Sequence, residues 1–118
     1  MLMLAVANPI STPTTTRLRV LVIEDERDLV EGLVYNLERE GYATIVAHDG
    51  LEGLRKAQTL LPDLILLDIM LPGLSGTDIL RELRSGERTR EIPVIIISAK
   101  AEETDQVVGF SLGADDYV

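Results

Sequence analysis

Three runs of consecutive apolar residues stand out along the chain, at 20–23, 64–67 and 94–97. Strands covered on both faces, as in a parallel sheet, have this pattern because neither face meets water. We therefore predict three central strands at these positions. Two further strands are expected at 43–47 and 115–118, where shorter apolar stretches adjoin turn residues.

Between these strands, apolar residues recur at helical spacing. The spacing predicts helices around 29–37, 51–57, 79–83 and 102–112, and glycines follow three of them. Strands and helices thus alternate along the chain. Such alternation is typical of an α/β fold with a doubly wound parallel sheet and right-handed crossovers, in which ligands bind beyond the carboxyl ends of the strands.

The length of 118 residues fits a single domain. Residues 8–16 are rich in Pro, Ser and Thr and have no apolar period, so we expect a flexible N-terminal tail at 1–16 and a folded domain at 17–118. No apolar stretch approaches the 18 residues or so of a membrane helix. The chain has no cysteine, which excludes disulfides and thiolate chemistry and fits a cytoplasmic protein.

Charge and aromatic content limit the class of ligand. The net charge of -9 repels phosphate backbones, and the aromatic content of 3% gives little surface on which bases could stack. We therefore expect no nucleic-acid binding by this domain. The acidic balance suits divalent cations or basic protein surfaces.

Polar side chains follow each of the three central apolar runs. Glu24 and Asp25 follow the first run, Asp68 follows the second, on the expected middle strand, and Ser98 follows the third. Carboxylates about 5 Å apart repel by roughly 3 kcal/mol at an effective dielectric near 20, and a divalent cation turns this repulsion into attraction. Mg²⁺ prefers such hard oxygen ligands, so the pattern predicts a magnesium site at this edge of the sheet.

Four segments, in this order, resemble the receiver domain of bacterial two-component response regulators: VIEDE at 22–26, DLILLDIMLPG at 63–73, ISAK at 97–100 and GADDY at 113–117. The resemblance runs from about Arg17 to Val118. It implies a flavodoxin-like fold whose five parallel strands lie in the order 2-1-3-4-5. The last segment is typical of regulators that carry a winged-helix DNA-binding domain.

The resemblance also implies roles for particular residues. Asp68 would accept a phosphoryl group from a partner histidine kinase. Mg²⁺ would be held by Asp25 directly, by Glu24 through water, by Asp68, and by the backbone carbonyl of Met70.

Two further residues would carry the switch. Ser98 would hydrogen-bond the phosphoryl oxygens, and Tyr117 would move from an exposed to a buried rotamer. The output of the parent protein would be transcriptional control, through a DNA-binding domain that this chain lacks.

One departure from the family concerns the C-terminal end of the chain. The family places a lysine two residues after the Tyr117 position, and this chain stops at Val118. Lys100 matches a variable position and is expected to be a solvated loop charge. We therefore expect an incomplete receiver domain without its last helix, which is marginally stable or forms a homodimer through exchanged or exposed sheet surface.

Two other functions are compatible with parts of the pattern. A Mg²⁺-dependent phosphatase with an aspartate nucleophile needs an acid two residues on, where this chain has Met70, which cannot transfer a proton. A pseudo-receiver that acts only as a binding surface stays open for a chain without the lysine. His48 offers no catalytic triad and is expected on the surface, as are the arginines Arg81, Arg84, Arg88 and Arg90.

Overall fold

The computed structural model describes residues 17–97 and 116–117. Four of the sequence predictions lie outside these residues: the tail at 1–16, the helix at 102–112, and the roles of Ser98 and Lys100. The elements follow in the order β1 (Arg19–Ile23), α1 (Arg27–Arg39), β2 (Ala43–Ala47), α2 (Gly50–Leu60), β3 (Leu64–Asp68), α3 (Gly76–Ser85), β4 (Val94–Ile97) and β5 (Asp116–Tyr117).

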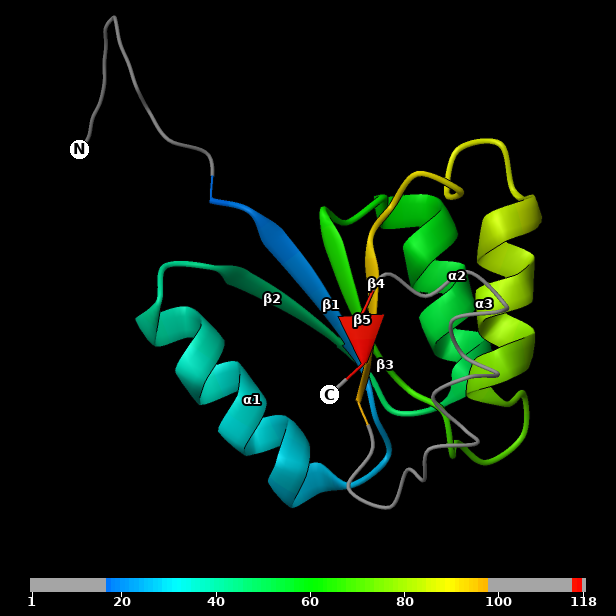
Figure 1. Cartoon of the computed structure of the whole chain (residues 1–118). Coiled ribbons are helices and arrows are strands. Elements are labelled where there is room, and N and C mark those ends of the chain that lie inside the picture. Colours follow the sequence, from blue (N-terminus) through cyan, green and yellow to red (C-terminus); the bar gives the residue numbers. More distant parts are fainter. Residues whose placement is uncertain (1–16, 98–115, 118) are drawn as a thin grey trace, which may run out of the picture.

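The five strands form one parallel sheet in the order β2-β1-β3-β4-β5, as expected. Helix α1 lies on one side of this sheet, and α2 and α3 lie on the other (Figure 1). The sequence prediction differs from the structure at the end of β3. Asp68 belongs to the strand itself, because it pairs with Ile97 of β4, and does not merely follow the strand.

Helices on both sides explain why the central strands are continuously apolar. In β1, Leu21 and Ile23 belong to the core that α2 and α3 cover, whereas Val20 and Val22 pack toward Val30 of α1. All four strand residues are buried. Because side chains of a strand point alternately to opposite faces, an apolar residue is needed at every position.

Two helices begin at capping residues. The side chain of Asp49 accepts a hydrogen bond from the backbone N–H of Glu52 at 2.8 Å, and that of Ser75 accepts one from Asp78 at 3.3 Å. These bonds satisfy amide groups that a helix leaves unpaired in its first turn. They fix where α2 and α3 start relative to the strand ends that precede them.

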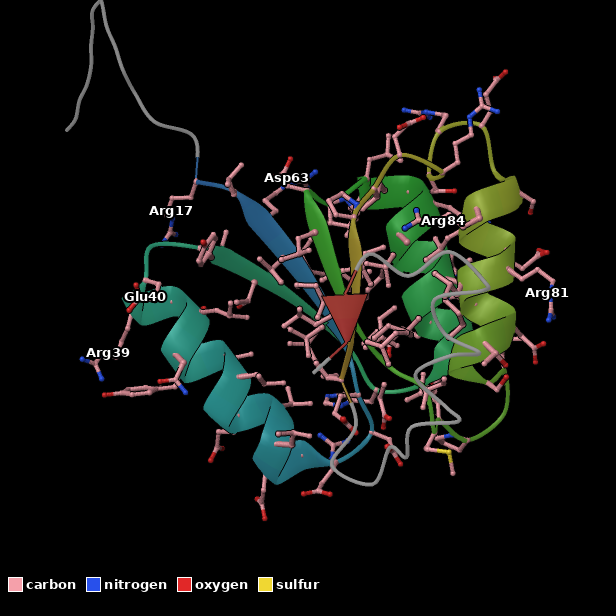
Figure 2. All side chains as sticks on the ribbon, in the orientation of Figure 1. Arg17, Arg39, Glu40, Asp63, Arg81 and Arg84 are labelled. Carbon is pink, nitrogen blue, oxygen red and sulfur yellow. The ribbon has the colours of Figure 1, made fainter. Side chains whose placement is uncertain are left out.

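The arginines of the α3 region divide into two kinds. In Figure 2, Arg81 points away from α3, and it forms an exposed ion pair with Asp78. Arg84, by contrast, is half-buried, and its Nη1 donates to the carbonyl oxygens of Arg90 and Ile92 at 2.9 and 2.7 Å. The expectation of a wholly solvated arginine face is therefore wrong for Arg84, which ties the connection before β4 to the end of α3.

Within residues 17–97 and 116–117, every helix is too short or too polar to span a bilayer.

Candidate functional site

Glu24 and Asp68 lie side by side at the carboxyl edge of the sheet. Strands β1 and β3 are parallel neighbours, and Ile23 pairs with Leu67. Glu24 therefore comes next to Asp68 where both strands end. The N–H of Glu24 donates to the carbonyl oxygen of Ala47 in β2 at 3.0 Å, so its main chain still follows the line of the sheet.

Three of the predicted metal ligands converge at this edge. Glu24, Asp25 and Asp68 each offer a carboxylate oxygen, and these oxygens lie within 4.8 Å of one another. Glu24 is 3% exposed and Asp68 7% exposed, whereas Asp25 faces solvent. Negative charges this close repel strongly when two of them are buried, because burial removes the water that would screen them.

Burial, together with this crowding, makes the carboxyl group of Glu24 hold a proton more tightly. Its pKa rises from the usual 4.5 to about 7. Burial is the main cause, and the carboxylates of Asp68 and Asp25 add to it, while the N–H of Glu26, which donates to Oε2 of Glu24 at 3.1 Å, acts in the opposite direction. A cation at this site would therefore compete with a proton near neutral pH.

Asp68 is oriented by the loop that follows it. Its Oδ1 accepts a hydrogen bond from the backbone N–H of Met70 at 3.0 Å. The Met70 side chain is 66% exposed beside it. This bond sets the direction of the Asp68 carboxylate at the mouth of the site.

The start of α3 packs closely against the same loop. The N–H of Gly76 donates to the carbonyl oxygen of Ile69 at 3.2 Å, and a Cβ at Gly76 would lie 2.5 Å from the carbonyl oxygen of Asp68. Only glycine leaves room for this approach. The main chain around Asp68 is thus held by α3 as well as by the sheet.

His48 also lies at this edge, where the sequence did not place it. The residue is half-buried, and its Nδ1 lies 3.3 Å from the carbonyl oxygen of Glu24. The expectation of a surface histidine is therefore wrong. The signal that would have found this contact is the pairing of β1 with β2, which brings the residue after Ala47 next to the residue after Ile23.

Glu24, Asp25 and Asp68 form an acidic cluster, and the ion pairs of the described residues do not include it. In the described part of the chain, ion pairs join Lys56 to Glu52 and Arg81 to Asp78. Neither pair includes a carboxylate of the cluster. Buried carboxylates are commonly paired with a cation, and among the described residues these three have no such partner in an ion pair.

Of the two predicted switch residues, the structure places only one. Tyr117 lies in β5, where it pairs with Ile96 of β4. Its change of rotamer stays a prediction, and Ser98 lies outside the described residues.

Comparison with known proteins adds the family to this geometry. The response regulator receiver domain matches residues 20–118. The chain is 49% identical over 100 residues to the alkaline phosphatase synthesis transcriptional regulatory protein PhoP of Bacillus subtilis, covering 85% of this chain and 41% of that protein. It is 42% identical over 104 residues to the DNA-binding response regulator MtrA of Mycobacterium tuberculosis, covering 88% and 44%. The chain thus spans about two fifths of the length of these relatives.

A solved structure is similar in both fold and sequence. The receiver domain of a sensor histidine kinase from Pseudomonas aeruginosa PAO1, crystallised with a magnesium ion coordinated in its active site cleft, superposes with a TM-score of 0.80 at 30% identity. The match covers 87% of this chain and 84% of that one. Sequence, sheet order and comparisons agree, and the chain belongs to the response regulator receiver domain family of two-component systems.

Proposed function

We propose that this chain is a phosphoacceptor switch, in which Asp68 accepts a phosphoryl group from a partner histidine kinase with Mg²⁺ and thereby changes a transcriptional output. The observation that carries the proposal is the convergence of three carboxylates within 4.8 Å around the end of the central strand. Membership of the receiver family supports the same assignment.

The donor set at this edge fits Mg²⁺. Carboxylate and carbonyl oxygens are the hard ligands that this ion prefers, and it commonly takes only one or two protein carboxylates and keeps several waters. Asp25, Asp68 and the backbone carbonyl of Met70 would hold the ion, with Glu24 acting through water. When bound, the ion neutralises the charge that spreads over the phosphoryl oxygens during transfer.

The chain itself supplies the nucleophile and its orientation. A carboxylate oxygen of Asp68 forms a bond to phosphorus as the bond between phosphorus and the histidine nitrogen of the kinase breaks. The Met70 N–H that donates to Asp68 Oδ1 holds the carboxylate still during this exchange. Positioning of this kind is the largest part of what a protein contributes to phosphoryl transfer.

The response to the phosphoryl group would pass through Ser98 and Tyr117. Ser98 would hydrogen-bond the new oxygens and draw its loop inward, and Tyr117 would turn to a buried rotamer. Such a switch works by population shift, and moving an equilibrium from 1:99 to 99:1 takes about 5.5 kcal/mol of differential binding.

The parent protein would act on transcription through a winged-helix domain. The two relatives named above are a transcriptional regulatory protein and a DNA-binding response regulator. The domain described above would turn over no external substrate. A phosphatase of the aspartate-nucleophile type is disfavoured because its general acid would have to be Met70.

Acetyl phosphate tests the site assignment without the kinase. We expect the chain, incubated with acetyl phosphate and Mg²⁺, to gain one phosphoryl group that hydroxylamine removes, as seen by intact mass. Asp68→Asn should gain none, and chelation of Mg²⁺ should prevent the reaction. Asp63→Asn is the matched control, because Asp63 lies at the opposite edge of the sheet and should leave the modification unchanged.

Two results would overturn the proposal. One is modification of Asp68→Asn at the rate of the unsubstituted chain. The other is no modification of either form in a version extended past Val118 to include the family's lysine.

A further inference from the structure

His48 donates a hydrogen bond to the main chain of Glu24, just after β1. Its Nδ1 lies 3.3 Å from the carbonyl oxygen of Glu24. A carbonyl oxygen can only accept, so the ring hydrogen must be on Nδ1. The ring is half-buried, which keeps water from replacing this bond freely.

The main chain of His48 is in turn held by helix α2. The backbone N–H of His48 donates to Oε1 of Glu52 at 2.9 Å, and Glu52 forms an ion pair with Lys56 at 3.2 Å. The Nζ of Lys56 also donates to the carbonyl oxygen of Val46 at 2.6 Å. These contacts lower the pKa of Glu52, chiefly through the His48 N–H, so Glu52 stays an ionised acceptor. His48 is therefore a fixed donor.

The end of β2 holds the main chain of Glu24 on both sides. The N–H of Glu24 donates to Ala47, and its carbonyl oxygen accepts from His48. That carbonyl belongs to the peptide that joins Glu24 to Asp25. Its orientation sets the direction in which the main chain enters Asp25, and hence where the exposed carboxylate of Asp25 can reach.

We propose that His48 is a positioning residue for the divalent cation site, through its Nδ1–H bond to the carbonyl oxygen of Glu24. The inference rests on the proposed function, since it assumes that the carboxylates of Glu24, Asp25 and Asp68 bind Mg²⁺. His48 touches neither the ion nor the phosphoryl group. It holds the loop in the conformation in which the carboxylates converge before the ion arrives.

Mg²⁺ affinity of four forms of the chain tests this role. Titration calorimetry would compare the unsubstituted chain with His48→Leu, His48→Asn and His48→Gln at one mildly alkaline pH, where Glu24 is ionised. We expect His48→Leu to raise the dissociation constant about tenfold, as loss of an outer partner of a metal ligand commonly does. His48→Asn should keep the Mg²⁺ affinity of the unsubstituted chain, because its amide nitrogen can lie close to the position of Nδ1. His48→Gln should lose affinity as His48→Leu does, because its amide nitrogen lies farther from the main chain than Nδ1.

A second measurement separates positioning from a general loss of structure. At saturating Mg²⁺, the rate of phosphorylation of His48→Leu by acetyl phosphate should return to that of the unsubstituted chain, because Asp68 and its bond to Met70 are untouched. The matched control is Thr44→Val, which removes the 3.0 Å bond from Thr44 in β2 to Glu38 in α1 and should leave the affinity unchanged.

The outcomes distinguish this inference from the function on which it rests. Equal affinities of His48→Leu and the unsubstituted chain would overturn the positioning role and leave the metal site intact. Equal rescue by His48→Gln and His48→Asn would also overturn it, since the side chain would then only fill space. An unsubstituted chain that binds no Mg²⁺ would overturn both proposals together.

Discussion

Charged residues have opposite surroundings at the two edges of the sheet, the amino edge where the strands begin and the carboxyl edge where they end. At the amino edge, Arg19 and Asp63 bind each other and the neighbouring main chain. At the carboxyl edge, Glu24, Asp25 and Asp68 crowd one another within 4.8 Å. Both edges are built by the same strands, β1 and β3, so the contrast comes from the side chains and not from the backbone.

The amino edge is satisfied by reciprocal hydrogen bonds. The N–H of Arg19 donates to Oδ2 of Asp63 at 2.7 Å, and the N–H of Asp63 donates back to the carbonyl oxygen of Arg19 at 2.9 Å. The guanidinium of Arg19 also donates to the carbonyl oxygens of Leu60 and Leu61 at the end of α2. Leu61 has a left-handed φ of 46°. Figure 2 shows Asp63 at the start of β3.

The amino edge of the sheet thus contributes to stability, whereas the carboxyl edge carries the candidate functional site. Paired polar groups at the amino edge stabilise the turn between α2 and β3. Crowded carboxylates at the carboxyl edge, two of them buried, cost folding free energy, and natural proteins accept such local conflicts chiefly at functional sites. Substitutions at the two edges should therefore change stability in opposite directions.

Among single substitutions, the largest effect is expected at the amino edge. Arg19→Ala removes the guanidinium bonds to Leu60 and Leu61 and should lower the free energy of unfolding by about 2 kcal/mol, as expected for hydrogen bonds from a charged donor. Urea denaturation measures the loss. Mg²⁺ affinity should not change, since the carboxyl edge is untouched.

Arg81→Ala is the control for Arg19→Ala. Arg81 is an exposed arginine in an ion pair with Asp78, and its removal should cost no more than about 0.5 kcal/mol. Equal losses in the two variants would mean that the amino edge has no special role in stability.

The next effect is a pH dependence that originates at the carboxyl edge. Because the pKa of Glu24 rises from 4.5 to about 7 on folding, the folded chain binds more protons than the unfolded chain between these values. Its stability without Mg²⁺ should therefore fall as pH rises through this window. Melting temperatures at a series of pH values, with Mg²⁺ or a chelator, should show that stabilisation by Mg²⁺ grows as pH rises. A stabilisation by Mg²⁺ that is the same at every pH would contradict this.

The smallest effect comes from removing one charge of the cluster. Glu24→Gln keeps the shape of the side chain and should stabilise the metal-free chain at pH 8 by about 1 kcal/mol, because part of the repulsion among the carboxylates disappears. It should also weaken Mg²⁺ binding and flatten the pH dependence attributed to Glu24. Denaturation by urea at several pH values measures both changes.

Glu26→Gln provides the comparison for Glu24→Gln. Glu26 is exposed and holds Glu24 through its backbone N–H, which the substitution keeps. We expect no gain in stability and an unchanged pH dependence. A gain as large as that of Glu24→Gln would show that net charge, and not the cluster, is responsible.

Most of the sheet could be predicted because burial on both faces imposes a simple pattern. The runs at 20–23, 64–67 and 94–97 each became a strand, since helices cover both sides of the sheet. The convergence of Glu24, Asp25 and Asp68 followed from parallel strands ending at one edge. These inferences need only the order of elements and the direction of the strands.

Other features depend on contacts that periodicity does not encode. The bond from His48 to Glu24 requires the register between β1 and β2, and the bonds from Arg84 require the connection before β4 to fold back over α3. The sequence predicts that Asp68 follows the strand, because the apolar run ends at Leu67. In the structure, however, the strand pairing includes Asp68. The apolar pattern of the sequence thus predicts where strands and helices lie. The register between the strands decides which side chains come into contact at the site.

The pairing of Ile23 with Leu67 limits how this protein can change over evolution. Insertion or deletion of one residue inside β1 would turn each following side chain of the strand to the opposite face of the sheet. The carboxylates would then no longer converge, and the packing of the core would be lost at the same time. Length variation among descendants of this chain should therefore be purged from the first strand.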